Sequence, residues 1–128
     1  PGDARCPELD WCASAYVLHV TDNLRLHAER MAASARGGEY LFRGVDQDEV
    51  AVARGYDVVP IEGALWSLAS VLGPYLDAYR EAAAADVGLP HETRGAQRAI
   101  DVLRGNTHDA HHHAWDLGRI RSANALDE

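Results

Sequence analysis

The segment WCASAYVLHVTDNLRLHAERMAASA, residues 11–35, carries the pattern from which the fold follows. Asp10 precedes it as a helix N-cap and Gly37-Gly38 follow it as a stop, so one long helix is expected here. Its apolar residues fall on two sides of a helical projection: Trp11, Ala15, Leu18 and Leu26 on one, and Ala13, Val17, Val20, Leu24 and Met31 on the other. A helix that is apolar on two sides is packed from two sides.

A second helical pattern covers residues 60–85. Pro60 suits a first helical turn, and apolar residues then recur at three- and four-residue spacing. Gly73-Pro74 predict a kink within this helix, because proline removes a backbone donor and clashes with the preceding turn.

A third long pattern covers residues 93–123, with Thr93 as the expected N-cap. Between the first two, the acidic run at 46–49 is expected to cap a short helix that ends before Gly55. No segment alternates like a strand. The sequence therefore predicts an all-α, up-down bundle of three main antiparallel helices in a single domain over residues 1–128.

Three helices, one of them apolar on two sides, leave apolar surface to cover. A fourth helix from outside this chain would cover it, most simply through a homodimer.

The composition indicates which binding partners and which cellular compartment to expect. Twelve basic and twenty acidic residues give a net charge of −8, which repels phosphate backbones and anionic lipid headgroups. No apolar run is long enough to cross a membrane and no secretion signal opens the chain, so a cytoplasmic protein that binds neither nucleic acid nor membrane is expected. Cys6 and Cys12 match neither a redox pair nor a zinc motif, and we interpret them as unpaired thiols, with a local disulfide as the alternative.

The histidine residues are the part of the sequence that indicates a metal site. Four of the seven histidines lie in the segment HDAHHHAWD, residues 108–116. His108 and His112 are one helical turn apart, so both rings can grip one metal ion, as H-x-x-x-H pairs do in zinc enzymes. His19, within the first helix, is the candidate third ligand, whereas His113 points away from the pair. Spacing alone leaves open a solvated histidine-rich helix face.

Two segments resemble the DinB-like (DNA-damage-inducible) family of metal-binding helical bundles, which is related to bacterial thiol-dependent S-transferases. Trp11 followed by His19-Val20-Thr21-Asp22 is similar to the family's W-x7-H-(V/L)-x-D segment, and residues 108–116 are similar to its H-(D/E)-x-x-H-H-x-x-D segment. The resemblance implies a divalent metal, zinc most readily and nickel or iron otherwise, on His19, His108 and His112. It also implies a further helix before the tryptophan segment, which this chain lacks; the missing helix is a second reason to expect dimerisation or a trimmed chain.

Three other residues are candidates for the site. Asp22, one turn after His19, and Asp116, one turn after His112, are expected to support the metal site, as a general base or as acceptors for imidazole N–H groups. Trp115 is expected to border a substrate pocket. An exposed carboxylate or a packed tryptophan remains the alternative for each.

Three functions are compatible with these residues. The first is an enzyme whose metal activates water or a low-molecular-weight thiol, either a hydrolase or an S-transferase acting on a small molecule. The second is a module that sequesters a small molecule or a metal without turnover. The third is a structural helical dimer with inert histidines. The substrate cannot be inferred from helical periodicity.

Overall fold

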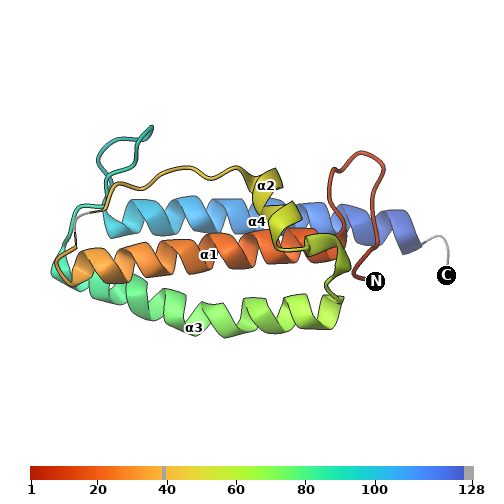
Figure 1. The fold of residues 1–128 in the computed structure, drawn as a ribbon, viewed down its shortest axis with the longest axis horizontal. Helices are drawn as coiled ribbons and strands as arrows, with labels where there is room; N and C mark the ends of the chain where they lie inside the picture. The colour runs from red at the N-terminus through yellow and green to blue at the C-terminus, as the bar shows by residue number, and fades with distance from the viewer. Residues whose placement is uncertain (39, 126–128) are drawn as a thin grey trace.

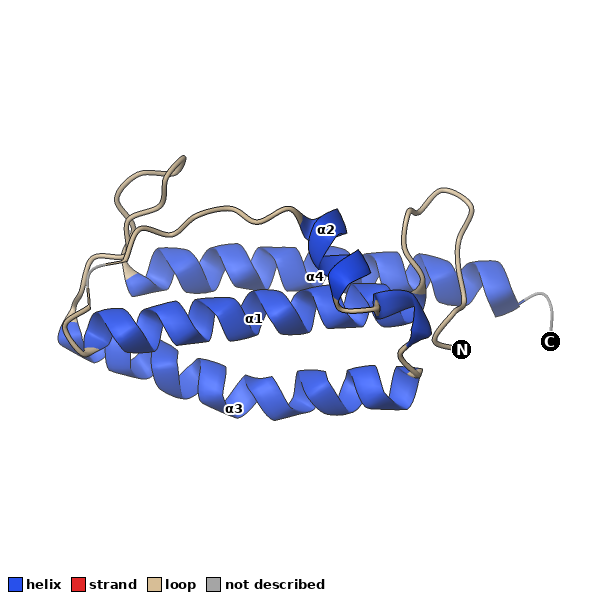
Figure 2. Cartoon of the chain, in the orientation of Figure 1, coloured by secondary structure: helices blue, strands red, loops and turns tan. Residues whose placement is uncertain are grey.

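The computed structural model describes residues 1–38 and 40–125 and consists of helices joined by loops (Figures 1 and 2). The long helices are α1 (Ala13–Ala35), α3 (Ile61–Ala85) and α4 (Ala99–Asn124). The short α2 (Gln47–Ala53) and a 3-10 turn, η1 (Tyr56–Val58), lie between α1 and α3. The described residues contain isolated β-bridges and no β-strand, so the all-α prediction is confirmed.

The directions of the long helices differ from the prediction. The starts of α1 and α3 share one core cluster, through Ala15 and Ala64, and their ends share another, through Met31 and Ala82. These two helices are therefore parallel, and only α4 runs the other way (Figure 1). The antiparallel prediction was wrong because residues 36–60, predicted as a connecting loop with a short helix, are long enough to carry the chain back to the start of α1. This crossover segment returns along the whole of α1, which is about 34 Å long at 1.5 Å per residue.

Helix α1 lies between α3 and α4 (Figure 1), as its two apolar sides predict. Its burial extends to polar side chains, among them His19, Thr21 and Asp22. Residues 1–10 fold back over its start, where the carbonyls of Gly2 and Ala4 accept from Ser14 N–H and Ala13 N–H at 2.9 Å each. These carbonyls take the place of the expected Asp10 cap, and the helix begins two residues later than predicted, with Cys12 as N-cap.

Helix α4 begins at Ala99, not after Thr93. Backbone hydrogen bonds pair Leu89 with Gln97 and His91 with Gly95, and Gly95 adopts a positive φ of 76°, so this stretch forms a closed loop. Thr93 contacts the His91 ring rather than capping a helix. The start of the helix is instead capped by Asp101, whose carboxylate accepts from Arg98 N–H at 2.9 Å.

The other sequence predictions on the fold are largely confirmed. Helix α2 is capped by the Asp46 side chain, which accepts from Asp48 N–H and Glu49 N–H, and it ends before Gly55. Helix α3 ends at Ala85 with Pro74 inside it. Cys6 and Cys12 are both buried free thiols. None of the described helices has the length and apolarity needed to cross a bilayer.

The crossover segment and the loop before α4 are tied together at one end of the bundle (Figure 2). Phe42, fully buried, donates its N–H to Pro90 at 2.7 Å and accepts from Glu92 N–H at 2.8 Å. This pairing holds residues 42–47 over the groove between α1 and α4.

Candidate metal centre

The inner face of α4 is partly polar, and this face forms the site. Its buried positions are Ala99, Val102, Asn106, Asp116 and Ile120, and together with Asp109 and His113 they recur every three or four residues. Asp109 and His113 are partly buried and lie on the same stripe, separated by one helical turn. Both therefore face α1.

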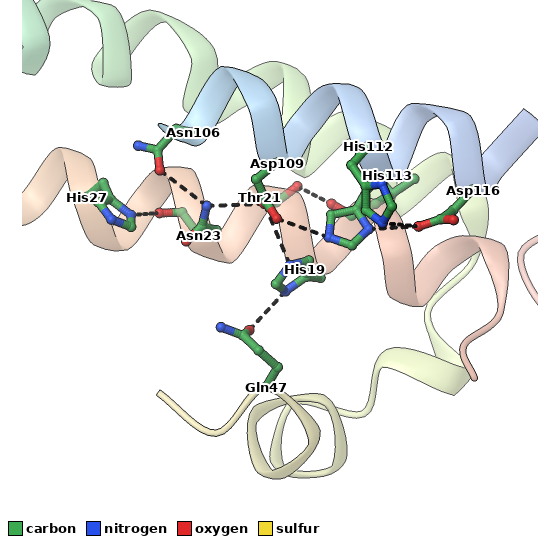
Figure 3. A network of polar contacts seen from close by, with 11 residues as sticks. His19, Thr21, Asn23, His27, Gln47, Asn106, Asp109, His112, His113 and Asp116 are labelled. Carbon is green, nitrogen blue, oxygen red and sulfur yellow. Dashed lines mark hydrogen bonds and ion pairs between the residues drawn. The ribbon is translucent and has the colours of Figure 1, made fainter. Parts of the chain in front are cut away.

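Asp109 and His113 meet His19 of α1 (Figure 3). His19 Nε2 lies 3.7 Å from Asp109 Oδ2, and His113 Nε2 lies 3.2 Å from Asp109 Oδ1. One potential ligand atom from each of the three residues lies within 4.8 Å of the others. Metal bonds of about 2.1 Å require ligand atoms roughly 3.4 Å apart in a tetrahedron, so modest side-chain rotations suffice to enclose an ion. The three residues, called the His-Asp-His group below, could hold a metal.

Each imidazole of this group is oriented through its other ring nitrogen. His19 Nδ1 lies 2.9 Å from Gln47 Oε1, at the start of α2, and His113 Nδ1 lies 3.2 Å from Asp116 Oδ2. Amide and carboxylate oxygens accept, so both Nδ1 atoms carry the proton. Both Nε2 atoms face Asp109, and once they carry no proton they can offer a lone pair toward the centre of the group. Such outer partners fix the tautomer and the orientation of metal-binding histidines.

The electrostatics of the group in its metal-free form are those of an ion pair. Burial opposes the charge on Asp109, but hydrogen bonds from His113 and His19 outweigh burial and hold the pKa of this carboxyl well below its ordinary value. The hydrogen bond to Asp109 raises the pKa of His113, and burial opposes this effect. Protons therefore compete with a metal for His113 more strongly than for an ordinary histidine.

The structure does not bring His108 and His112 to His19. Both lie on the outer face of α4, where they line an open groove with His111, and the His112 side chain is 60% exposed. Successive residues on a helix are about 100° apart. The expected ligand pair is thus displaced by one residue from Asp109 and His113, which point inward.

The remaining candidates have definite positions. Asp116 is buried and supports an imidazole as expected, but its hydrogen bond goes to His113, while His112 Nε2 lies 3.7 Å away. Trp115 is 61% exposed, with Arg119 over its ring, and does not border the His-Asp-His group.

Asp22 is bound in a different network. It accepts from Tyr56 Oη and pairs with Arg54 Nε, both at 2.6 Å, and Arg25 lies near its other oxygen. None of its contacts within the described residues is to the His-Asp-His group. These contacts fix α1 to the end of the crossover segment.

Sequence reasoning missed Asp109 and His113 as potential ligands and Gln47 as an orienting residue. The signal for the first two was available, because Ala110 and Leu117 mark the apolar side of the last helix and His113 lies between them. Gln47 carried no signal, since only the path of the crossover segment places it beside His19.

A comparison with protein-family models, curated proteins and solved structures found no match to this chain. The resemblance to DinB-like proteins therefore stays a prediction.

Proposed function

We propose that this protein binds one divalent metal ion through His19, Asp109 and His113. The observation that supports the proposal is the convergence of these three side chains from two helices, with both imidazoles held at their far nitrogens by Gln47 and Asp116. A chance cluster of exposed histidines would not have partners on the side away from the ion. The ligand set replaces the three histidines expected from the family resemblance.

The donor types agree with the metals named from sequence. Two imidazoles and one carboxylate occur in zinc hydrolases, and the same set with open positions is typical of iron(II) enzymes. Neutral imidazoles also accept nickel. Zinc remains our first expectation because three protein ligands and one open position suit its four-coordinate chemistry.

We further propose that the site is catalytic, in a DinB-like hydrolase or thiol S-transferase. A divalent ion with an open position lowers the pKa of a water or thiol that occupies it. The chain's own contribution is to fix the ligands: Gln47 and Asp116 set the two ring orientations, and Asn23 Nδ2 lies 3.4 Å from Asp109 Oδ2. A cavity next to the group, described below, gives a small molecule access.

Elemental analysis of untagged protein tests the proposal, with His113→Ala and His112→Ala as a matched pair on one helix. About one equivalent of metal is expected in the wild type and in His112→Ala, with none in His113→Ala. Metal lost from His112→Ala and kept in His113→Ala would support the ligand set first read from the sequence. No metal in the wild type, even after reconstitution, would refute the proposal.

A second experiment separates catalysis from sequestration. Cobalt(II) is substituted into the site, and a small thiol is added while the absorption spectrum is recorded. A changed spectrum indicates an open position and supports the enzyme. An unchanged spectrum indicates a closed site and favours the sequestering module.

A further inference from the structure

A cavity of about 210 Å³ adjoins the His-Asp-His group. It follows α1 from His19 past Asn23 and His27 to Arg30, a span of about 16 Å at 1.5 Å per residue. Figure 3 shows the inner part of this row, with Asn106 and Asp109 of α4 facing it. The crossover segment and the loop before α4 form the remaining wall.

The outer part of this cavity is lined by three arginines, Arg30, Arg43 and Arg94. All twelve basic residues of the chain are arginines. Within the part of the chain that the structure describes, seven of the twelve form ion pairs with carboxylates: Arg5, Arg25, Arg36, Arg54, Arg80, Arg98 and Arg119. The five without such a pair in these residues are Arg30, Arg43, Arg94, Arg104 and Arg121. Three of those five therefore line a single cavity in a protein of net charge −8.

The arginine end is a built feature. Arg30 Nη1 donates to the Arg43 carbonyl at 3.0 Å, and its guanidinium lies over the Phe42 ring at 5.4 Å. The neighbouring carboxylate of Glu92 accepts from Gly44 N–H at 2.8 Å and forms no ion pair with the three arginines in the described residues. The only carboxylate that lines the described cavity is Asp109, at the opposite end. Positive charge thus lies at one end and negative charge at the other.

We propose that this cavity, which we call the arginine pocket, binds a small organic carboxylate that is the substrate of the adjoining metal site. Guanidinium groups pair with carboxylates through two parallel hydrogen bonds, and Arg30, Arg43 and Arg94 would hold that end. The uncharged body of the molecule would lie along Asn23 and His27, and its far end would reach the His-Asp-His group. Inorganic phosphate is compact and charged on every side, so it would leave the inner half of the pocket unfilled.

The role as a substrate rests on the proposed function, but the binding does not, and it is measured without metal. Calorimetric titration of protein stripped of metal and then dialysed free of chelator uses succinamate, which has one carboxylate and one uncharged amide, and succinamide, its neutral counterpart. The variants are Arg30→Gln and Arg94→Gln, with Arg121→Gln as control, because Arg121 also lacks an ion pair in the described residues and lies outside the pocket.

Succinamate is expected to bind the wild type and Arg121→Gln alike, and to bind Arg30→Gln and Arg94→Gln at least about tenfold more weakly, the effect of losing one hydrogen bond to a charged group. Succinamide is expected to show no binding. Absence of succinamate binding, an equal loss in Arg121→Gln, or tighter binding of inorganic phosphate would overturn the proposal.

The two proposals fail separately. Arginine-dependent binding of succinamate by a protein that takes up no metal would refute the proposed function and support the arginine pocket as an anion site. One equivalent of metal without any succinamate binding would overturn the pocket and leave the metal site standing.

Discussion

The Tyr56→Phe substitution tests whether Asp22 is a structural anchor, as its contacts indicate, rather than a catalytic base. Tyr56 is 2% exposed, and its hydroxyl donates to Asp22 Oδ2 at 2.6 Å. Phenylalanine keeps the ring and its edge contact with Trp11 while removing this hydrogen bond. A hydrogen bond to a charged group contributes about 1.5–3 kcal/mol to stability. The free energy of unfolding should fall by that amount.

The same loss of free energy corresponds to a decrease in melting temperature. Unfolding entropy is about 2.1 cal/mol/K per residue, or roughly 0.27 kcal/mol/K for 128 residues, so Tm should fall by about 6–11 °C. Calorimetry and urea titration measure the two quantities. Tyr79→Phe is the control, because its hydroxyl makes no hydrogen bond within the described residues, and a change below about 0.5 kcal/mol is expected there. Equal stability of both variants, or loss of metal from Tyr56→Phe at unchanged stability, would refute the anchoring role.

Three further outcomes are expected. Gln47→Ala should weaken metal affinity about 10- to 100-fold at unchanged stoichiometry, because His19 Nδ1 loses its hydrogen-bond partner. Competition with a chelator measures the affinity. An unchanged affinity would show that Gln47 plays no part in the site. In metal-free protein the Asp109–His113 pair should contribute most to stability between the ordinary pKa values of the two groups, roughly pH 4 to 6.5. Below that window the contribution is lost as Asp109 is protonated toward its lowered pKa, and above it the contribution is lost as pH rises through the raised pKa of His113; urea titrations in His113→Ala should lack this profile. Leu72, on α3, is 45% exposed. If the expected homodimer forms through this face, Leu72→Glu should convert the dimer to a monomer, as measured by analytical ultracentrifugation. A monomeric wild type would contradict the dimer.

The helices could be predicted from sequence because their signals are local. Apolar spacing and capping residues placed the ends of α2 and α3 within a residue or so, and predicted two packed sides for α1. The parallel course of α1 and α3 carries no local signal, because it depends on how far residues 36–60 travel. The late start of α4 depends on hydrogen bonds such as Leu89 N–H to Gln97, which no capping rule anticipates.

For the candidate site, the sequence predicted that His19 meets the histidine-rich segment of the last helix, but it predicted three histidines where the structure has two histidines and Asp109, and it did not predict which residues of that segment face inward. His19 and the histidine-rich segment do meet, yet the inward residues are Asp109 and His113. Helical spacing identifies pairs that share a face, and it fits any such pair equally well. The apolar pattern normally indicates which face of a helix is buried. Here the inner face combines apolar residues with the polar Asn106 and Asp116, so the apolar pattern did not identify it as the buried face.

The crossover segment carries residues that can be substituted more freely than those of the packed helices. It is joined to the core through buried residues such as Phe42 and Tyr56, and it supplies Gln47 to the candidate metal centre, Arg43 to the arginine pocket and Tyr56 to the anchor. Helix α2 within it has no buried residue. Arg43, Gly44 and Val45 line the cavity and are exposed, so substitutions there can alter what the cavity accepts without repacking the helices. Such a division lets the ligand of the cavity be varied through loop substitutions while the helical scaffold is kept.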